Sequence, residues 1–143
     1  MKNLIFLGLS LITISTWAQP VMQFKAGSES YVVEKLTDGH GTIWGVEFIN
    51  NDLIIFTEKN GRIQTLDLKT GVPRLLQNLP KIYDAGQGGL LDIALHPEFK
   101  ENSWVYVTYA KKIATGGQTT AVARARLDVT DRHHNHVFEI DAV

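Results

Sequence analysis

The sequence predicts an all-β fold, on three observations. Short apolar or alternating runs recur along the chain, each bounded by residues typical of turns. After residue 20, no segment combines a sustained helical period with capping residues. The strand pattern also repeats, and periods of about 40–50 residues holding several strands are typical of β-propeller blades. We therefore expect a β-propeller architecture.

The expected strands follow one another with short turns between them. The pair Asn60-Gly61 suits a tight hairpin with positive φ. Turn residues also gather at 38–41, 50–52 and 69–71. The strands expected in this part of the chain are Tyr31–Leu36, Ile43–Ile49, Leu53–Thr57 and Arg62–Leu68.

A comparison of the chain with itself supports the repeat. Three segments align with three later ones, at an offset of 47 residues in the first pair and 51 in the second. The growing offset places insertions in loops, chiefly at residues 111–118. Two imperfect copies also fit a β-sandwich whose meanders look alike, so the pattern favours the propeller without excluding the sandwich. The aligned pairs are Gly45–Phe48 with Asp92–Leu95, Ile54–Thr57 with Val105–Thr108, and Ile63–Asp67 with Ala123–Leu127 or, shifted by one, with a segment that ends on Leu127-Asp128.

Residues 1–18 have the three parts of a secretory signal peptide. Lys2 lies near the start, Leu4–Ile14 is apolar, and the small residue Ala18 closes the segment. The apolar run is too short to cross a bilayer, which takes about 20 residues. We expect cleavage between Ala18 and Gln19, no membrane span afterwards, and a periplasmic or secreted protein.

The length of the chain bears on the propeller. A closed ring needs at least about four blades, on the order of 160 residues, whereas residues 19–143 number 125. The chain also ends in mid-pattern, at Val137–Val143. We expect residues 19–143 to be the N-terminal part of an incomplete propeller domain, with only its first one to two blades. Two alternatives stay open: several short chains assemble into one ring, or the chain is itself a complete exported β-protein.

Composition excludes several classes of function. The chain has 14 Lys+Arg against 15 Asp+Glu, so there is no basic surplus to bind nucleic acid or an anionic membrane. It has no cysteine, which excludes disulfides, cysteine-bound zinc, iron–sulfur clusters and thiol catalysis.

The densest motif is the run Asp84–Phe99, in which a Gly-Gln-Gly-Gly loop leads into an apolar strand. The glycines allow a backbone to approach a ligand closely, and the amide of Gln87 offers both donor and acceptor atoms. The motif is not a dinucleotide fingerprint, because Leu91 stands where the third glycine belongs, and no P-loop lysine follows. From spacing alone, a structural connection between blades explains the glycines best.

Asp84–Phe99, together with Trp44–Phe48 and Thr57–Ile63, resembles the soluble, pyrroloquinoline-quinone-dependent aldose sugar dehydrogenases, also called glucose/sorbosone dehydrogenases. The likeness covers roughly residues 30–128. It implies a six-bladed propeller that seats the quinone at one end of the ring and oxidises the anomeric hydroxyl of an aldose to a lactone. In the family, a histidine takes the hydroxyl proton, hydride passes to the quinone, calcium polarises the cofactor, and an external acceptor takes the electrons.

The resemblance assigns one cofactor-binding residue, Gln87, which matches the family glutamine that hydrogen-bonds the quinone beside the sugar. The family's catalytic histidine, the basic residues that bind the cofactor carboxylates and the calcium ligands belong to loops beyond Val143. The catalytic residue is therefore unknown, no metal ligand is assigned, and we expect this chain to be inactive alone. The alternative is a non-catalytic exported propeller that binds carbohydrate or a protein partner.

Other polar residues favour structural interpretations. Asp131–His136 resembles a metal cluster, but its spacing supplies no converging carboxylate, so we favour a solvated turn. His96, before a proline, is expected to cap a turn. Asp92 is expected to make a structural hydrogen bond to a neighbouring loop, and Glu58 with Arg62 a weak hairpin ion pair. The aromatic residues expected to pack between blades are Trp44, Trp104 and Tyr106.

Overall fold

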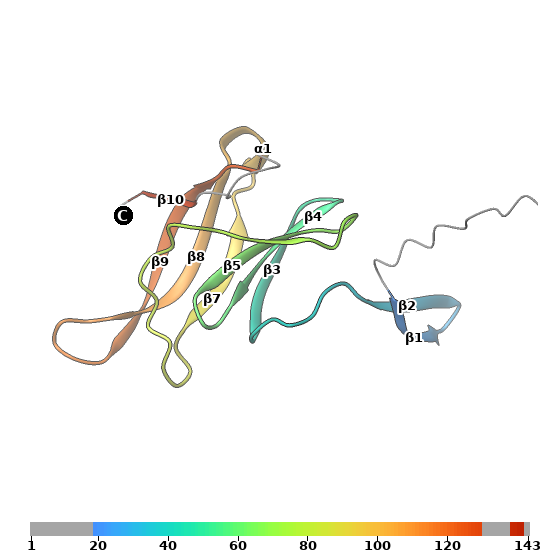
Figure 1. Ribbon diagram of the computed structural model, residues 1–143, viewed down its shortest axis with the longest axis horizontal. Helices are drawn as coiled ribbons and strands as arrows, with labels where there is room; N and C mark the ends of the chain where they lie inside the picture. Colours follow the sequence, from blue (N-terminus) through green and yellow to red (C-terminus); the bar gives the residue numbers. More distant parts are fainter. Residues whose placement is uncertain (1–18, 130–137, 142–143) are drawn as a thin grey trace, which may run out of the picture.

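The computed structural model describes residues 19–129 and 138–141, and these are dominated by strands (Figure 1). The predicted all-β class is confirmed. A single-turn helix, which the sequence did not predict, interrupts the strands after β7. The elements are β1 (Gln19–Ala26), β2 (Glu29–Lys35), β3 (Ile43–Asn50), β4 (Leu53–Glu58), β5 (Arg62–Asp67), β6 (Pro73–Leu75), β7 (Leu90–Leu95), α1 (Phe99–Asn102), β8 (Trp104–Lys112), β9 (Gln118–Leu127) and β10 (Phe138–Asp141).

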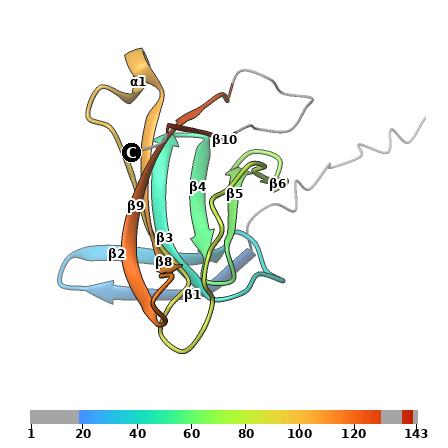
Figure 2. The ribbon, with the colours of Figure 1, turned by 90° about the vertical axis from the view of Figure 1, so that its left-hand side faces the viewer.

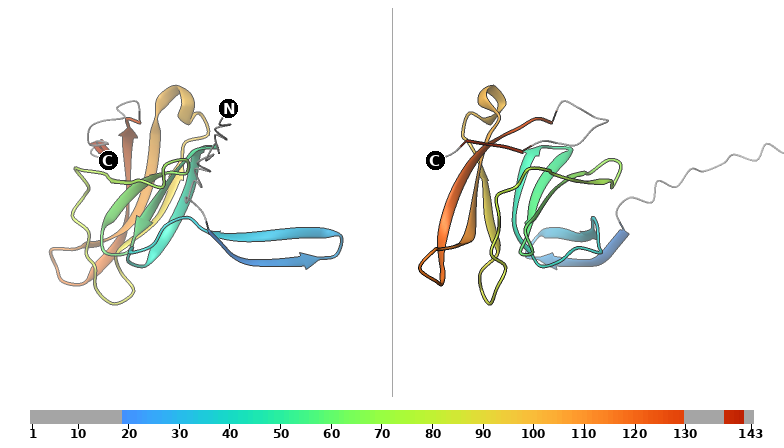
Figure 3. Two further views of the ribbon diagram at one scale, coloured as in Figure 1. Left: turned by 45° about the vertical axis from the view of Figure 1, so that its right-hand side comes forward. Right: turned by 60° about the vertical axis from the view of Figure 1, so that its left-hand side comes forward.

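Two four-stranded antiparallel meanders form the body of the molecule. One contains β3, β4, β5 and β6 in that order, and the other contains β7, β8, β9 and β10 (Figures 1 and 2). Strands β3 and β7 are each the first strand and one edge of their sheet, and β7 packs against β3 and β4. The two sheets lie side by side as layers (Figure 3). This is the arrangement of two adjacent propeller blades with β3 and β7 as their inner strands.

The main core lies between the two sheets. Alternation along β8 sends Val105 and Val107 into it, and Ile55 and Ile63 enter from the facing sheet, all at most 1% exposed. Because side chains alternate across a strand, each sheet supplies every second residue to this interface. The core is therefore an interface between sheets rather than the interior of either one.

The predicted repeat extends to single hydrogen bonds. Both inner strands have an irregular register at the same aligned place, between Ile43 and Val46 and between Leu90 and Ile93. The amide of Gly45 donates to Thr57 Oγ1 at 3.0 Å. The aligned amide of Asp92 donates to Thr108 Oγ1, also at 3.0 Å. The self-alignment of the sequence is therefore confirmed for its first two pairs. In the third, strand pairing places Ile63–Asp67 on Val122–Arg126, one residue earlier than the sequence alignment expected.

The turn between β4 and β5 is the predicted tight hairpin. It contains the three residues 59–61, and the amide of Gly61 donates to the carbonyl of Glu58 at 2.9 Å. The expected positive φ is found at Gly61, at 94°, and not at Asn60. This is the three-residue hairpin in which a glycine follows a tight turn.

Strand β1 was not predicted, because Pro20 and polar side chains interrupt its apolar pattern. It pairs with β2 in a hairpin that projects away from the two larger sheets (Figures 1 and 3). The rings of Phe24 and Tyr31 stack across the pair with centroids 5.3 Å apart. Among the described residues, no helix has the length and apolar character needed to span a membrane.

Candidate functional site

The candidate site is the loop of residues 84–89, here called the Gln87 loop, which leads directly into β7. The amide of Gly88 donates to the carbonyl of Ala85 at 2.9 Å, and Gly86 has φ of +57°. The loop is therefore a tight turn that relies on a glycine conformation. The side chain of Gln87 is exposed, so packing does not account for it.

Two glycines of the loop have structural explanations. A Cβ on Gly88 would lie 2.5 Å from Gln118 Oε1 and 3.0 Å from the Cβ of Ala110. A Cβ on Gly89 would overlap the backbone carbonyl of Lys59, and its φ of +153° also disfavours other residues. At Gly86, in contrast, a Cβ would meet nothing within 4 Å. The structural interpretation of the glycines is therefore correct for Gly88 and Gly89, and open space surrounds the loop beside Gln87.

The end of β4 connects the two inner strands beside this loop. The hydroxyl of Thr57 accepts from the amide of Gly45 on β3 and donates to the carbonyl of Leu91 on β7 at 2.5 Å. One fully buried side chain therefore joins both sheets. This explains why a threonine stands at the start of the Thr-Glu-x-x-Gly-Arg-Ile motif.

Lys59, two residues later, holds the chain before each inner strand. Its amide donates to the carbonyl of Thr42 at 2.8 Å, and its carbonyl accepts from the amide of Leu90 at 2.9 Å. Its ammonium lies 2.5 Å from the carboxylate of Asp84. The Gln87 loop is thus bound to the β4–β5 turn near both of its ends.

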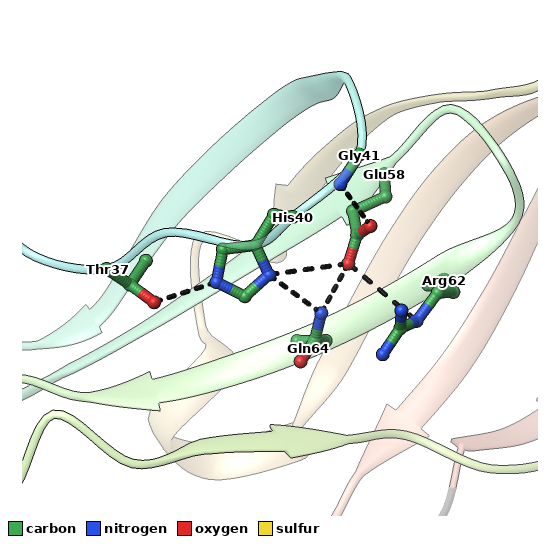
Figure 4. A network of polar contacts seen from close by, with 6 residues as sticks. All are labelled: Thr37, His40, Gly41, Glu58, Arg62 and Gln64. Carbon is green, nitrogen blue, oxygen red and sulfur yellow. Dashed lines mark hydrogen bonds and ion pairs between the residues drawn. The ribbon is translucent and has the colours of Figure 1, made fainter.

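Glu58 lies between these two residues in a buried polar cluster (Figure 4). Its side chain is 0% exposed, and its carboxylate accepts from the amide of Gly41 at 2.8 Å and from the side-chain amide of Gln64. Gln64 also lies 3.2 Å from His40 Nδ1, and the other ring nitrogen of His40 lies 2.7 Å from the Thr37 hydroxyl. The cluster fixes the chain that enters β3.

The environment of Glu58 changes its acidity. Burial raises the pKa of the carboxyl, but hydrogen bonds from Gly41 and Gln64 and the nearby charge of Arg62 act in the opposite direction and outweigh it. The pKa of Glu58 therefore lies below its ordinary value. Arg62 Nε is 3.8 Å from the carboxylate, and its side chain is 48% exposed. The expected hairpin ion pair is therefore present, but the carboxylate is buried and takes its main partners from Gly41 and Gln64.

Sequence reasoning missed this cluster because its members are far apart in the chain. The one available signal was the position of Gln64, which pairs with Phe56 across the hairpin and so shares a face with apolar residues. A polar side chain at such a position requires a partner. The amide of Gln64 finds that partner in Glu58.

The other singled-out residues have structural surroundings. His96 caps a turn as predicted, since its Nδ1 accepts from the amide of Glu98 at 3.0 Å and lies 2.8 Å from the side chain of Asn102. Asp92 is exposed, and its carboxylate accepts from the adjacent amide of Ile93 at 2.9 Å rather than from a neighbouring loop. Asp131–His136 lies outside the described residues.

The three aromatic residues do not pack between the two sheets as expected. Trp44 is 49% exposed. The ring of Trp104 lies under the guanidinium groups of Arg124 and Arg126, at 4.0 and 4.8 Å. Tyr106 stacks on His96 with centroids 6.2 Å apart. Trp104 and Tyr106 alternate with the buried residues of β8, so they belong to its opposite face.

Gln87 presents an exposed amide, which can both donate and accept a hydrogen bond. In the part of the chain that the structure describes, no three His, Asp or Glu side chains gather to hold a metal ion.

The sequence model of the family described as glucose/sorbosone dehydrogenase matches residues 40–141. Aldose sugar dehydrogenase YliI of Escherichia coli is 29% identical over 125 residues, covering 85% of this chain and 32% of the relative. Quinoprotein glucose dehydrogenase B of Acinetobacter calcoaceticus is 30% identical over 110 residues, covering 70% and 22%. The chain therefore spans at most a third of the length of these relatives.

Solved structures show the same fold. A glucose dehydrogenase superposes with a TM-score of 0.64 at 29% identity, covering 73% of this chain and 33% of that one. The PQQ-bound form of an aldose sugar dehydrogenase from Streptomyces coelicolor superposes with a TM-score of 0.60 at 24% identity, covering 72% of this chain and 30% of that one. At this identity it supports the fold alone.

These comparisons confirm the β-propeller prediction, with two blades within the described residues. The family match extends from the entrance of β3 to the end of β10 and so includes both blades and the Gln87 loop between them. The chain belongs to the glucose/sorbosone dehydrogenase family.

Proposed function

We propose that residues 19–143 are the N-terminal part of an exported quinoprotein that oxidises the anomeric hydroxyl of aldose sugars to lactones. Residues 1–18 would be its signal peptide, cleaved between Ala18 and Gln19 to leave a periplasmic or secreted protein. Family membership supports a dehydrogenase, and the names of the relatives supply the sugar and the quinone. Pyrroloquinoline quinone is the proposed cofactor, from the family resemblance and from the quinoprotein among the relatives.

The observation that carries the proposal is the position of the Gln87 amide. It is exposed, and it lies in the loop that enters inner strand β7, next to the turn that also holds the entrance of inner strand β3. In a ring of such blades, inner strands surround the axis. A ligand seated at that end of the axis would meet Gln87 before it met the outer strands.

A bound quinone would supply the redox chemistry by accepting a hydride from the anomeric carbon. Gln87 would contribute a neutral amide that orients one quinone oxygen and tolerates both oxidation states. The tight turn around Gly86 leaves room for this contact, because nothing lies within 4 Å of that position. The proton acceptor and the calcium ligands are expected from sequence beyond Val143, and the residues described here would be inactive without them.

The test is reconstitution of the full-length protein with pyrroloquinoline quinone and calcium, followed by dye reduction with a panel of aldoses. Gln87→Ala should lower kcat/KM on the order of tenfold, the effect of losing one hydrogen bond of about 1.4 kcal/mol. The melting temperature should stay unchanged, because an exposed loop side chain contributes little packing. Gln77→Ala, at another exposed glutamine between the blades, is the matched control.

Two results would overturn this proposal. If the quinone binds but no aldose reduces the dye, the substrate assignment is wrong, and sugar binding without turnover would favour the non-catalytic propeller. If Gln87→Ala lowers stability and rate equally, Gln87 is a structural residue.

A further inference from the structure

Lys59 is the residue through which the β4–β5 turn holds the Gln87 loop. Its ammonium contacts Asp84 at the start of the loop at 2.5 Å, and its carbonyl accepts from Leu90 just after the loop at 2.9 Å. Its own amide is anchored to Thr42 at 2.8 Å. The loop is therefore tied at both ends to one residue that is itself fixed.

The chain contains a second ion pair with the same geometry at the other end of the same sheet. Lys69, after β5, contacts Asp52, before β4, also at 2.5 Å. The side chains of Lys69 and Asp52 are 71% and 51% exposed, whereas those of Lys59 and Asp84 are 25% and 41% exposed. The less exposed pair is thus the one beside Gln87, and the other provides a matched reference.

We propose that Lys59 is a positioning residue for Gln87, acting through Asp84 to hold the loop in the conformation that presents the amide. This role of Lys59 rests on the proposed function, which says what the Gln87 amide contacts. The tie itself is a property of the chain, and it is measurable without any cofactor. Lys59 would not touch the sugar, because its ammonium is engaged by Asp84.

The first measurement is amide hydrogen exchange in the full-length protein. Lys59→Met keeps the apolar stem and removes the charge, and it should accelerate exchange at residues 85–88 roughly two- to fivefold, the range of a partly exposed ion pair. Asp84→Asn should give the same result from the other partner. Lys69→Met should leave exchange in the loop unchanged. Unchanged exchange in both Lys59→Met and Asp84→Asn would overturn the proposal.

The second measurement is a double-mutant cycle with pyrroloquinoline quinone binding as its readout. Lys59→Met should weaken binding about three- to tenfold when Gln87 is present, and should have no further effect in Gln87→Ala. An equal loss in both backgrounds would show that Lys59 acts independently of Gln87 and would overturn the proposal. If the unsubstituted protein binds no quinone, the proposed function fails, and the exchange experiment alone decides whether Lys59 holds the loop.

Discussion

The two sheets have the same topology but differ along their inner strands. In both, an amide of the inner strand donates to a threonine of the second strand at 3.0 Å. On β3 that amide belongs to Gly45, which is buried against β7, whereas on β7 it belongs to the exposed Asp92. The backbone hydrogen bond is therefore common to both blades. The residue type at this position of the inner strand differs, because a second described sheet packs against Gly45 and none packs against Asp92 in the same way.

The second strands show the same contrast. Thr57 is fully buried, and its hydroxyl donates a hydrogen bond to the carbonyl of Leu91 in the next sheet, whereas Thr108 is only partly buried. The position after Thr57 holds the buried carboxylate of Glu58, and the position after Thr108 holds Tyr109. Substitutions at aligned positions should therefore have unequal effects, and each pair tests the comparison.

The largest difference is expected between Gly45→Ala and Asp92→Ala. A Cβ on Gly45 would lie 2.9 Å from the backbone nitrogen of Ile93 and 3.1 Å from the Cα of Asp92, so the sheets would have to separate. We expect a loss of roughly 3 kcal/mol in the free energy of unfolding. Asp92→Ala, at an exposed position, should cost under about 1 kcal/mol. Urea denaturation of the full-length variants measures both, and equal losses would contradict the buried-against-exposed contrast.

The next difference is expected between Thr57→Val and Thr108→Val. Valine preserves the shape but removes the hydroxyl, leaving a buried amide of Gly45 and the carbonyl of Leu91 without partners. The cost should be about 2 kcal/mol at Thr57 and at most about 1 kcal/mol at Thr108, where one bond is lost at a more exposed site. The same denaturation series measures it. A larger loss of unfolding free energy at Thr108 than at Thr57 would contradict the comparison, because it would require Thr108 to be the more buried of the two.

The smallest effect is a pH dependence that comes from Glu58 of the first sheet. Because the pKa of Glu58 lies below its ordinary value of 4.5, its ionised form stabilises the fold above that pH. The contribution falls as pH drops through the lowered folded-state pKa. Glu58→Gln should make the acid loss of stability shallower, as measured by urea midpoints between about pH 7 and pH 3. Asp67, whose pKa is lowered chiefly by a hydrogen bond from Thr70, retains part of the dependence. An unchanged slope in Glu58→Gln would contradict the assignment.

The strands and their repeat were predictable because they depend on local alternation. Each sheet buries one face against the other, so every second residue of β8 is apolar, and that pattern is visible without a structure. Strand β1 was missed because Pro20 and polar side chains interrupt its apolar pattern. Its partner β2 is equally exposed but was predicted, because its apolar residues are consecutive.

The candidate site was only partly predictable, for a related reason. Gln87 was singled out from the glycine motif and its role stays a prediction, whereas the contacts of Thr57 and Lys59 reach residues 25 to 34 positions away. Glu58 and Arg62 flank a turn, which indicated their ion pair, but the burial of Glu58 depends on the chain at Thr37–Gly41 folding over the sheet. Contacts between segments so far apart follow from the fold and not from spacing.

The hydroxyl bonds of the two blades have one further consequence. The carbonyl of Leu91 and the amide of Asp92 belong to the same peptide group, so the bonds of Thr57 and Thr108 are consecutive links. From the amide of Gly45 to the hydroxyl of Thr108, every donor points the same way along this chain of bonds. Aligned hydrogen bonds polarise one another. The bonds of Thr57 and Thr108 should therefore strengthen each other, and together they couple β3, β4, β7 and β8 through one hydrogen-bonded chain.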